Sequence, residues 1–122
     1  MKKHILTIDD EAEIRDLLVA ALGGRGYRVT AAASGVEALR IAQAEPIDLI
    51  ISDLQMEDAD GLELIAQLKQ IHPATPAILL TGVLFDPEVV RDNISKQVSC
   101  YIEKTSSLVK ILGEIQRIIG PP

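Results

Sequence analysis

The amino-acid sequence predicts an α/β domain built around a doubly wound, five-stranded parallel sheet. Apolar runs alternate with amphipathic segments five times along the 122 residues, and this alternation is typical of βαβ units. Three of the apolar runs are uninterrupted, as expected of parallel strands covered on both faces. A chain of this length is expected to form one domain and can bury a core without disulfides or metals.

Strands and helices are expected to alternate in order from the N-terminus. The strands are predicted over residues 4–8, 27–32, 48–52, 77–81 and 99–103. The helices are predicted over residues 12–23, 35–44, 61–71, 87–96 and 107–119.

Local signals support the first, second and last of the five helices. Apolar residues recur at spacings of three and four over residues 12–23, and glycines follow them, as is common at helix ends. Ser34 and Glu37 have the spacing of a capping box that opens the second helix. The apolar stripe returns over residues 107–119, which predicts that one face of the last helix packs on the sheet.

The strand patterns also predict the order of the sheet. The first, third and fourth strands are continuous apolar runs, which places them in the centre. The second and fifth alternate apolar and polar residues, which places them at the edges. Right-handed crossovers then favour the order 2-1-3-4-5. This is the flavodoxin-like order, with its switch point between the first and third strands.

Composition argues against several classes of partner. The net charge is -6 and the isoelectric point about 4.8, which disfavours unaided binding to nucleic acid or an anionic membrane. No segment approaches the roughly 20 apolar residues of a membrane span, and the first apolar run is too short for a secretory signal. Cys100 is the only cysteine, which fits a reducing compartment, so we expect a cytoplasmic location.

Polar residues occur where four of the predicted strands end. Asp9 and Asp10 follow the first strand, and Asp53 follows the third. Thr81 ends the fourth strand and Lys104 follows the fifth. Because the carboxyl ends of parallel strands open onto one crevice, these five side chains are expected to meet in one pocket.

Such a pocket suits a divalent cation and a phosphoryl group. Like charges about 4 Å apart repel by about 4 kcal/mol at an effective dielectric near 20, so the carboxylates would raise one another's pKa or recruit a cation. The available ligands are oxygens, which favours Mg²⁺. Asp53 is the candidate nucleophile, because a carboxylate can form an aspartyl phosphate. Lys104 and Thr81 could neutralise the phosphoryl oxygens.

Each of these residues also has an ordinary structural explanation. Asp10 could cap the first helix, with Glu13 three residues on. Asp53 could simply start a loop, Thr81 could end a strand, and Lys104 could be solvated. It is the coincidence of all of them at one end of the sheet that favours the functional interpretation.

Taken together, the motifs resemble the receiver domains of two-component response regulators. The resemblance covers essentially all of residues 1–122, which are expected to form one receiver domain. The motifs that carry it are Asp9-Asp10, Asp53-Leu54-Gln55-Met56 running to Asp60-Gly61, Thr81-Gly82, and Tyr101-Ile102-Glu103-Lys104.

The resemblance implies a phosphorylation site and a metal site. The phosphoryl group would pass to Asp53 from the phosphohistidine of a histidine kinase or a phosphotransfer protein. Mg²⁺ would be held by Asp10, Asp53 and the backbone carbonyl of Gln55, with Asp9 acting largely through water. The domain would catalyse only its own phosphoryl transfer and dephosphorylation.

The resemblance also implies a conformational switch and an output surface. Thr81 would move toward the phosphoryl group and Tyr101 would turn inward. The face formed by the fourth helix, fifth strand and fifth helix would contact an output domain or downstream protein, and phosphorylation could produce a homodimer. The resemblance names neither the cognate kinase, the input signal nor the output.

Two positions depart from the family pattern. Glu57 and Thr105 stand where proline is usual. The family's proline after the lysine usually follows a cis peptide bond, and a cis bond before a non-proline residue costs about 3–4 kcal/mol. The Lys104–Thr105 bond is therefore expected to be trans, which leaves the path of that loop open. Gln55 and Val83 are expected to overhang Asp53 and control the lifetime of its phosphoryl group.

The same fold is compatible with three other functions. The main alternative is a constitutive protein-binding module that is never phosphorylated. A flavin-binding electron carrier is disfavoured, because the Asp-Asp-Glu loop would repel the flavin phosphate and aromatic residues are only 2% of the chain. A hydrolase with an aspartyl-phosphate intermediate usually has an Asp-x-Asp motif after a strand, which neither the first nor the third strand supplies.

Overall fold

The computed structural model describes residues 2–54, 60–82 and 98–122. The helix expected over residues 87–96 lies outside these residues, as do Gln55, Glu57 and Val83. Within the described ranges, no helix is long and apolar enough to span a membrane.

Five parallel strands form one sheet in the order β2-β1-β3-β4-β5, which confirms the predicted topology. Parallel pairing joins β1 to β2 and β3, β3 to β4, and β4 to β5. The strands are β1 (His4–Ile8), β2 (Arg28–Ala32), β3 (Leu49–Asp53), β4 (Ala77–Thr81) and β5 (Cys100–Glu103).

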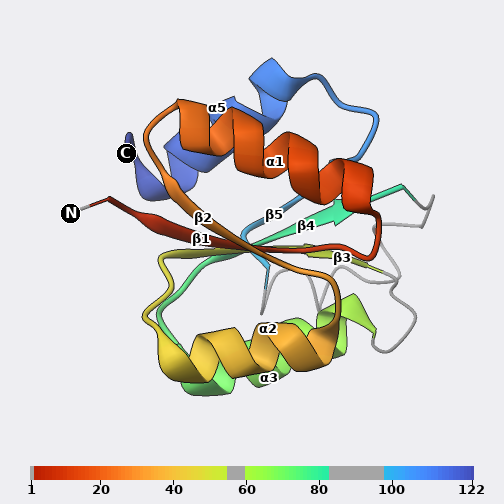
Figure 1. The fold of residues 1–122 in the computed structure, drawn as a ribbon, viewed down its shortest axis with the longest axis vertical. Coiled ribbons are helices and arrows are strands. Elements are labelled where there is room, and N and C mark those ends of the chain that lie inside the picture. Colours follow the sequence, from red (N-terminus) through yellow and green to blue (C-terminus); the bar gives the residue numbers. More distant parts are fainter. Residues whose placement is uncertain (1, 55–59, 83–97) are drawn as a thin grey trace.

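Helices cover both faces of this sheet, as a doubly wound fold requires. Figure 1 shows α1 and α5 on one face and α2 and α3 on the other. The described helices are α1 (Ala12–Gly24), α2 (Gly35–Ala44), α3 (Gly61–Ile71) and α5 (Leu108–Ile119).

The core is divided by the sheet into two apolar layers, because successive strand residues point to opposite faces. Leu6 of β1 and Ile50 of β3 pack in the layer that includes residues of α2 and α3. Their neighbours Ile5 and Ile51 pack in the layer that includes residues of α1 and α5. All residues of β1, β3 and β4 are buried, whereas β2 and β5 are partly exposed edges, as expected.

Four strand boundaries differ from the predicted ranges by one residue: the starts of β2, β3 and β5 and the end of β3. Asp53 is the last residue of β3 rather than the first of a loop, because it pairs in register with Leu80 of β4. Tyr27 precedes β2 rather than opening it, because its backbone N–H donates to the carbonyl of Leu22 at the end of α1. Asp53 is therefore held by the sheet itself.

Among the described helices, α2, α3 and α5 begin with a side-chain cap, and Ser107 provides the cap of α5. The Ser34 hydroxyl accepts a hydrogen bond from the backbone N–H of Glu37 at 3.2 Å, which confirms the predicted cap of α2. The carboxylate of Asp60 accepts from the backbone N–H groups of Leu62 and Glu63 and caps α3. Such caps satisfy amide groups that the helix itself leaves free.

Candidate functional site

Three aspartates lie together at the carboxyl ends of β1 and β3. Asp9 follows β1 directly, and β3 is paired with β1 up to Ser52, the residue before Asp53. Asp9, Asp10 and Asp53 each offer one carboxylate oxygen, and these oxygens lie within 4.8 Å of one another. Asp9 and Asp53 are buried, whereas Asp10 is exposed. Since all three donors are oxygens, the chemistry of the cluster fits Mg²⁺.

Asp10 does not cap the first helix. The N-cap residue of α1 is Glu11, and no side chain makes a capping hydrogen bond there. The structural explanation of Asp10 is therefore not observed, and its carboxylate belongs to the cluster.

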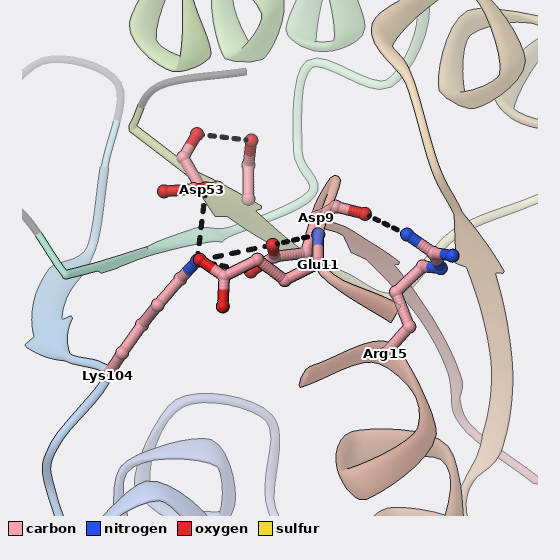
Figure 2. A network of polar contacts seen from close by, with 6 residues as sticks. Asp9, Glu11, Arg15, Asp53 and Lys104 are labelled. Atoms are coloured by element: carbon pink, nitrogen blue, oxygen red, sulfur yellow. Dashed lines mark hydrogen bonds and ion pairs between the residues drawn. The ribbon is translucent and has the colours of Figure 1, made fainter. Parts of the chain in front are cut away.

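Lys104 reaches into the cluster from the end of β5 (Figure 2). Its Nζ atom donates to Oδ2 of Asp53 at 3.1 Å, to Oε1 of Glu11 at 3.0 Å and to Oδ1 of Asp9 at 3.2 Å. The same Nζ lies 2.9 Å from the second carboxylate oxygen of Asp9. One ammonium therefore compensates three carboxylates.

Lys104 and Asp9 have shifted pKa values in this group of charges. Burial lowers the pKa of Lys104, but hydrogen bonds to Asp9, Glu11 and Asp53 outweigh it and raise the pKa above its usual value. The pKa of Asp9 is also raised, chiefly by burial, although the Glu11 amide and Lys104 oppose the shift. Lys104 therefore stays charged at neutral pH.

The peptide bond after Lys104 follows the sequence expectation, and the structure gives the path of the loop that the sequence left open. The Lys104–Thr105 peptide bond is trans, as predicted for a bond that precedes threonine. The backbone N–H of Lys104 donates to the carbonyl of Thr81 at 2.8 Å and ties the end of β5 to the end of β4. The replacement of the usual proline by Thr105 thus leaves Lys104 aimed at Asp53.

The loop between β1 and α1 holds Asp9 through contacts that sequence reasoning missed. The backbone N–H of Glu11 donates to Oδ1 of Asp9 at 2.9 Å. The guanidinium of Arg15 donates to the backbone carbonyl of Asp9 at 2.7 Å (Figure 2). The acidic run pointed to the loop but not to a contact between Glu11 and Lys104. No sequence signal singled out Arg15.

A glycine lets the start of α3 press against the end of β3. The backbone N–H of Gly61 donates to the carbonyl of Leu54 at 2.8 Å. A Cβ atom added to Gly61 would lie 2.0 Å from the backbone oxygen of Asp53. Only a residue without a side chain fits this approach, which explains why glycine follows Asp60 in this sequence.

The two predicted switch residues lie at different distances from the cluster. Thr81 is buried at the end of β4, the strand beside β3, so it borders Asp53. Tyr101 lies on the edge strand β5 and is 41% exposed. The structure thus brings together Asp9, Asp10, Asp53 and Lys104, with Thr81 at their border, whereas Tyr101 faces the surface.

Comparison with known proteins identifies the family. The family model of the response regulator receiver domain matches residues 5–116. The chain belongs to this family. It is a phosphorylation-dependent signalling receiver rather than a metabolic enzyme, and receiver domains work with histidine kinases and output domains.

Individual relatives agree with this receiver domain assignment. The transcriptional regulatory protein GlrR of Escherichia coli K12 is 40% identical over 87 residues, which are 71% of this chain and 20% of GlrR. The matched segment of this chain thus corresponds to about a fifth of the length of that relative.

Solved structures show the same fold over nearly the whole chain. Vibrio cholerae chemotaxis protein CheY4 has a TM-score of 0.89 at 29% identity, covering 97% of this chain and 99% of that one. Thermotoga maritima response regulator TrrA, solved in complex with Mg²⁺-BeF, has a TM-score of 0.82 at 29% identity, covering 95% of this chain and 98% of that one.

Proposed function

We propose that residues 1–122 form a receiver domain in which Asp53 accepts the phosphoryl group. The observation that carries this proposal is the ion pair between Asp53 and Lys104 beside two further aspartates. Asp53 is the one carboxylate of the cluster that lies within the sheet, at the end of the central strand β3. The sheet fixes the position of this nucleophile, and Lys104 lies where charge would develop.

The proposed transfer is a displacement at phosphorus. A carboxylate oxygen of Asp53 forms a bond to the phosphorus of a phosphohistidine. The bond from phosphorus to the imidazole nitrogen breaks, and its electron pair stays on that nitrogen. Lys104 would compensate negative charge on one phosphoryl oxygen, and the hydroxyl of Thr81 would donate to another.

Mg²⁺ is the proposed cofactor of this transfer. Asp10, Asp53 and the backbone carbonyl of Gln55 would hold the ion, with Asp9 acting largely through water. The bound ion would neutralise the remaining phosphoryl oxygen. The oxygen-only donor set of the three aspartates supports this choice, and so does the Mg²⁺-BeF complex of the similar protein TrrA.

The proposed partners are a histidine kinase or phosphotransfer protein as donor and an output domain or downstream protein as target. The target would contact the face that contains β5 and α5. Two exposed side chains support this surface, Tyr101 on β5 and Val109 on α5, which are 41% and 77% exposed. Phosphorylation would also allow two copies of the chain to form a homodimer.

Intact-mass spectrometry with acetyl phosphate and Mg²⁺ tests the acceptor. The wild-type protein should gain one phosphoryl group, and Asp53→Asn should gain none. Asp60→Asn is a suitable control, because Asp60 caps α3 and can still accept hydrogen bonds as asparagine. Phosphorylation of Asp53→Asn at the wild-type rate would refute the assignment of the acceptor, whereas a wild-type protein that gains no phosphoryl group would favour a constitutive binding module.

A further inference from the structure

The ammonium group of Lys104 has no free hydrogen in this structure. A lysine ammonium carries three N–H donors. One is donated to Asp9, one to Glu11 and one to Asp53. If a phosphoryl oxygen is to receive a hydrogen bond from Lys104, one of these carboxylates must release its donor.

The three carboxylates differ in how easily they can leave. The side chains of Asp9 and Asp53 are 2% and 6% exposed, whereas that of Glu11 is 59% exposed. A buried carboxylate that releases its cation loses part of its charge compensation in surroundings where water cannot replace it, which is costly. The carboxylate of Glu11 can instead rotate into water, where it is solvated at little cost.

The backbone of Glu11 makes a hydrogen bond to Asp9 that is separate from the side-chain contact with Lys104. Its N–H donates to Oδ1 of Asp9 at 2.9 Å, and this bond does not depend on the side chain. A change of the Glu11 side chain can therefore test the contact with Lys104 while the backbone bond that holds Asp9 remains.

We propose that Glu11 is a positioning residue that occupies one donor of Lys104 in the resting protein and yields it to the phosphoryl oxygen. This inference rests on the proposed function, because it concerns the same acceptor site. Glu11 then competes with phosphoryl oxygens for Lys104 and weakens the binding of phosphoryl groups and their analogues. Removing the charge of Glu11 should favour the state in which the site holds a phosphoryl group or an analogue.

Beryllofluoride binding in the presence of Mg²⁺ measures this competition directly. Glu11→Gln should bind beryllofluoride about two- to fivefold more tightly than wild type, the range expected for loss of an exposed ion pair. It should also be phosphorylated faster by a low concentration of acetyl phosphate, by a similar factor. Glu13→Gln is the matched control, because Glu13 is also exposed on the first turn of α1 and the change in net charge is the same. Glu13 makes no ion pair with the described residues.

The NMR signal of the Lys104 ammonium distinguishes competition for Lys104 from a purely structural role of the Glu11 side chain. In the free protein this signal should differ between wild type and Glu11→Gln. After saturation with beryllofluoride the two proteins should give the same signal, because Lys104 then contacts the side chain at position 11 in neither protein. A difference that persists in the saturated proteins would overturn the proposal.

The beryllofluoride affinities of the three proteins show whether only the role of Glu11 is wrong or whether the proposed function is wrong as well. Equal beryllofluoride affinities in wild type, Glu11→Gln and Glu13→Gln would overturn the role of Glu11 alone, and so would weaker binding by Glu11→Gln. Equal tightening in both variants would show that net charge acts rather than the contact, and would also overturn it. If the wild-type protein neither binds beryllofluoride nor gains a phosphoryl group, both proposals fail.

Discussion

Thr7 is a buried polar residue in the middle of the central strand β1. Its hydroxyl makes no hydrogen bond with the described residues, and the residue has no exposed surface. A buried hydroxyl without a partner costs stability. Thr7→Val should therefore raise the free energy of unfolding by about 1 kcal/mol. Urea denaturation of both proteins measures this change, and a lower stability of the variant would show that the hydroxyl has a partner such as water.

Cys100 is the one thiol of the chain, and its surroundings make it unreactive. Burial, followed by the nearby charge of Glu114, raises its pKa from 9.0 to about 11. Because the thiolate is the nucleophile, two units reduce the reactive fraction about a hundredfold near pH 8. The native protein should react with Ellman's reagent at about one hundredth of the rate seen in urea. Equal rates would contradict the shift.

At the scale of single residues, the position of a residue along its strand predicted most of the site. Asp9, Asp53 and Lys104 could be assigned because the ends of parallel strands must converge. Glu11 and Arg15 could not be assigned this way. The role of Glu11 depends on the position of the Lys104 side chain, which follows β5, and that of Arg15 depends on the path of the chain between β1 and α1. Local periodicity predicts neither of these.

Gly61 connects two elements, because α3 begins where the backbone of β3 ends. An alanine at this position would clash with the oxygen of Asp53, a backbone atom that cannot move aside cheaply. Gly61→Ala should lower the free energy of unfolding by about 1–3 kcal/mol, the usual cost of overpacking. It should also slow phosphorylation, since the acceptor would be displaced.

Gly113 of α5 provides the control for this change. Apart from the backbone of α5 itself, no atom of the described residues lies within 4 Å of the position that its Cβ would occupy. Gly113→Ala should raise the free energy of unfolding by about 0.5–1 kcal/mol, because alanine favours helix. Thermal unfolding of the two variants should therefore shift in opposite directions, and a stabilised Gly61→Ala would refute the close approach.

The helices and strands were predictable as elements because their apolar periodicities differ. The end of β3 was less predictable, because Asp53 joins the strand only through its pairing with β4. Polar residues after an apolar run look like loop residues when the neighbouring strand is not considered. The order of the strands in the sheet could be predicted because strands that are buried on both faces are apolar throughout, whereas edge strands alternate apolar and polar residues.

Across the whole molecule, the acidic cluster couples the stability of the fold to the metal ion. A ligand that binds only the folded state stabilises it, by about 1.4 kcal/mol at ten times its dissociation constant. Mg²⁺ should therefore raise the melting temperature, by about 4–6 °C at that concentration. Asp10→Ala should abolish the increase, whereas Asp16→Ala, on the exposed face of α1, should retain it. An undiminished increase in Asp10→Ala would refute the metal assignment.

The two ends of the chain lie together, opposite the acidic cluster (Figure 1). The ammonium of Lys3 donates to the carbonyl of Ile119, and the hydroxyl of Tyr27 donates to the carbonyl of Gly120 at 2.9 Å. The five residues of β1 separate this region from Asp9 by about 16 Å. A phosphoryl group at the acceptor site would therefore lie too far away to touch a domain joined at either end. Such a domain would sense phosphorylation through movement of packed elements rather than through direct contact.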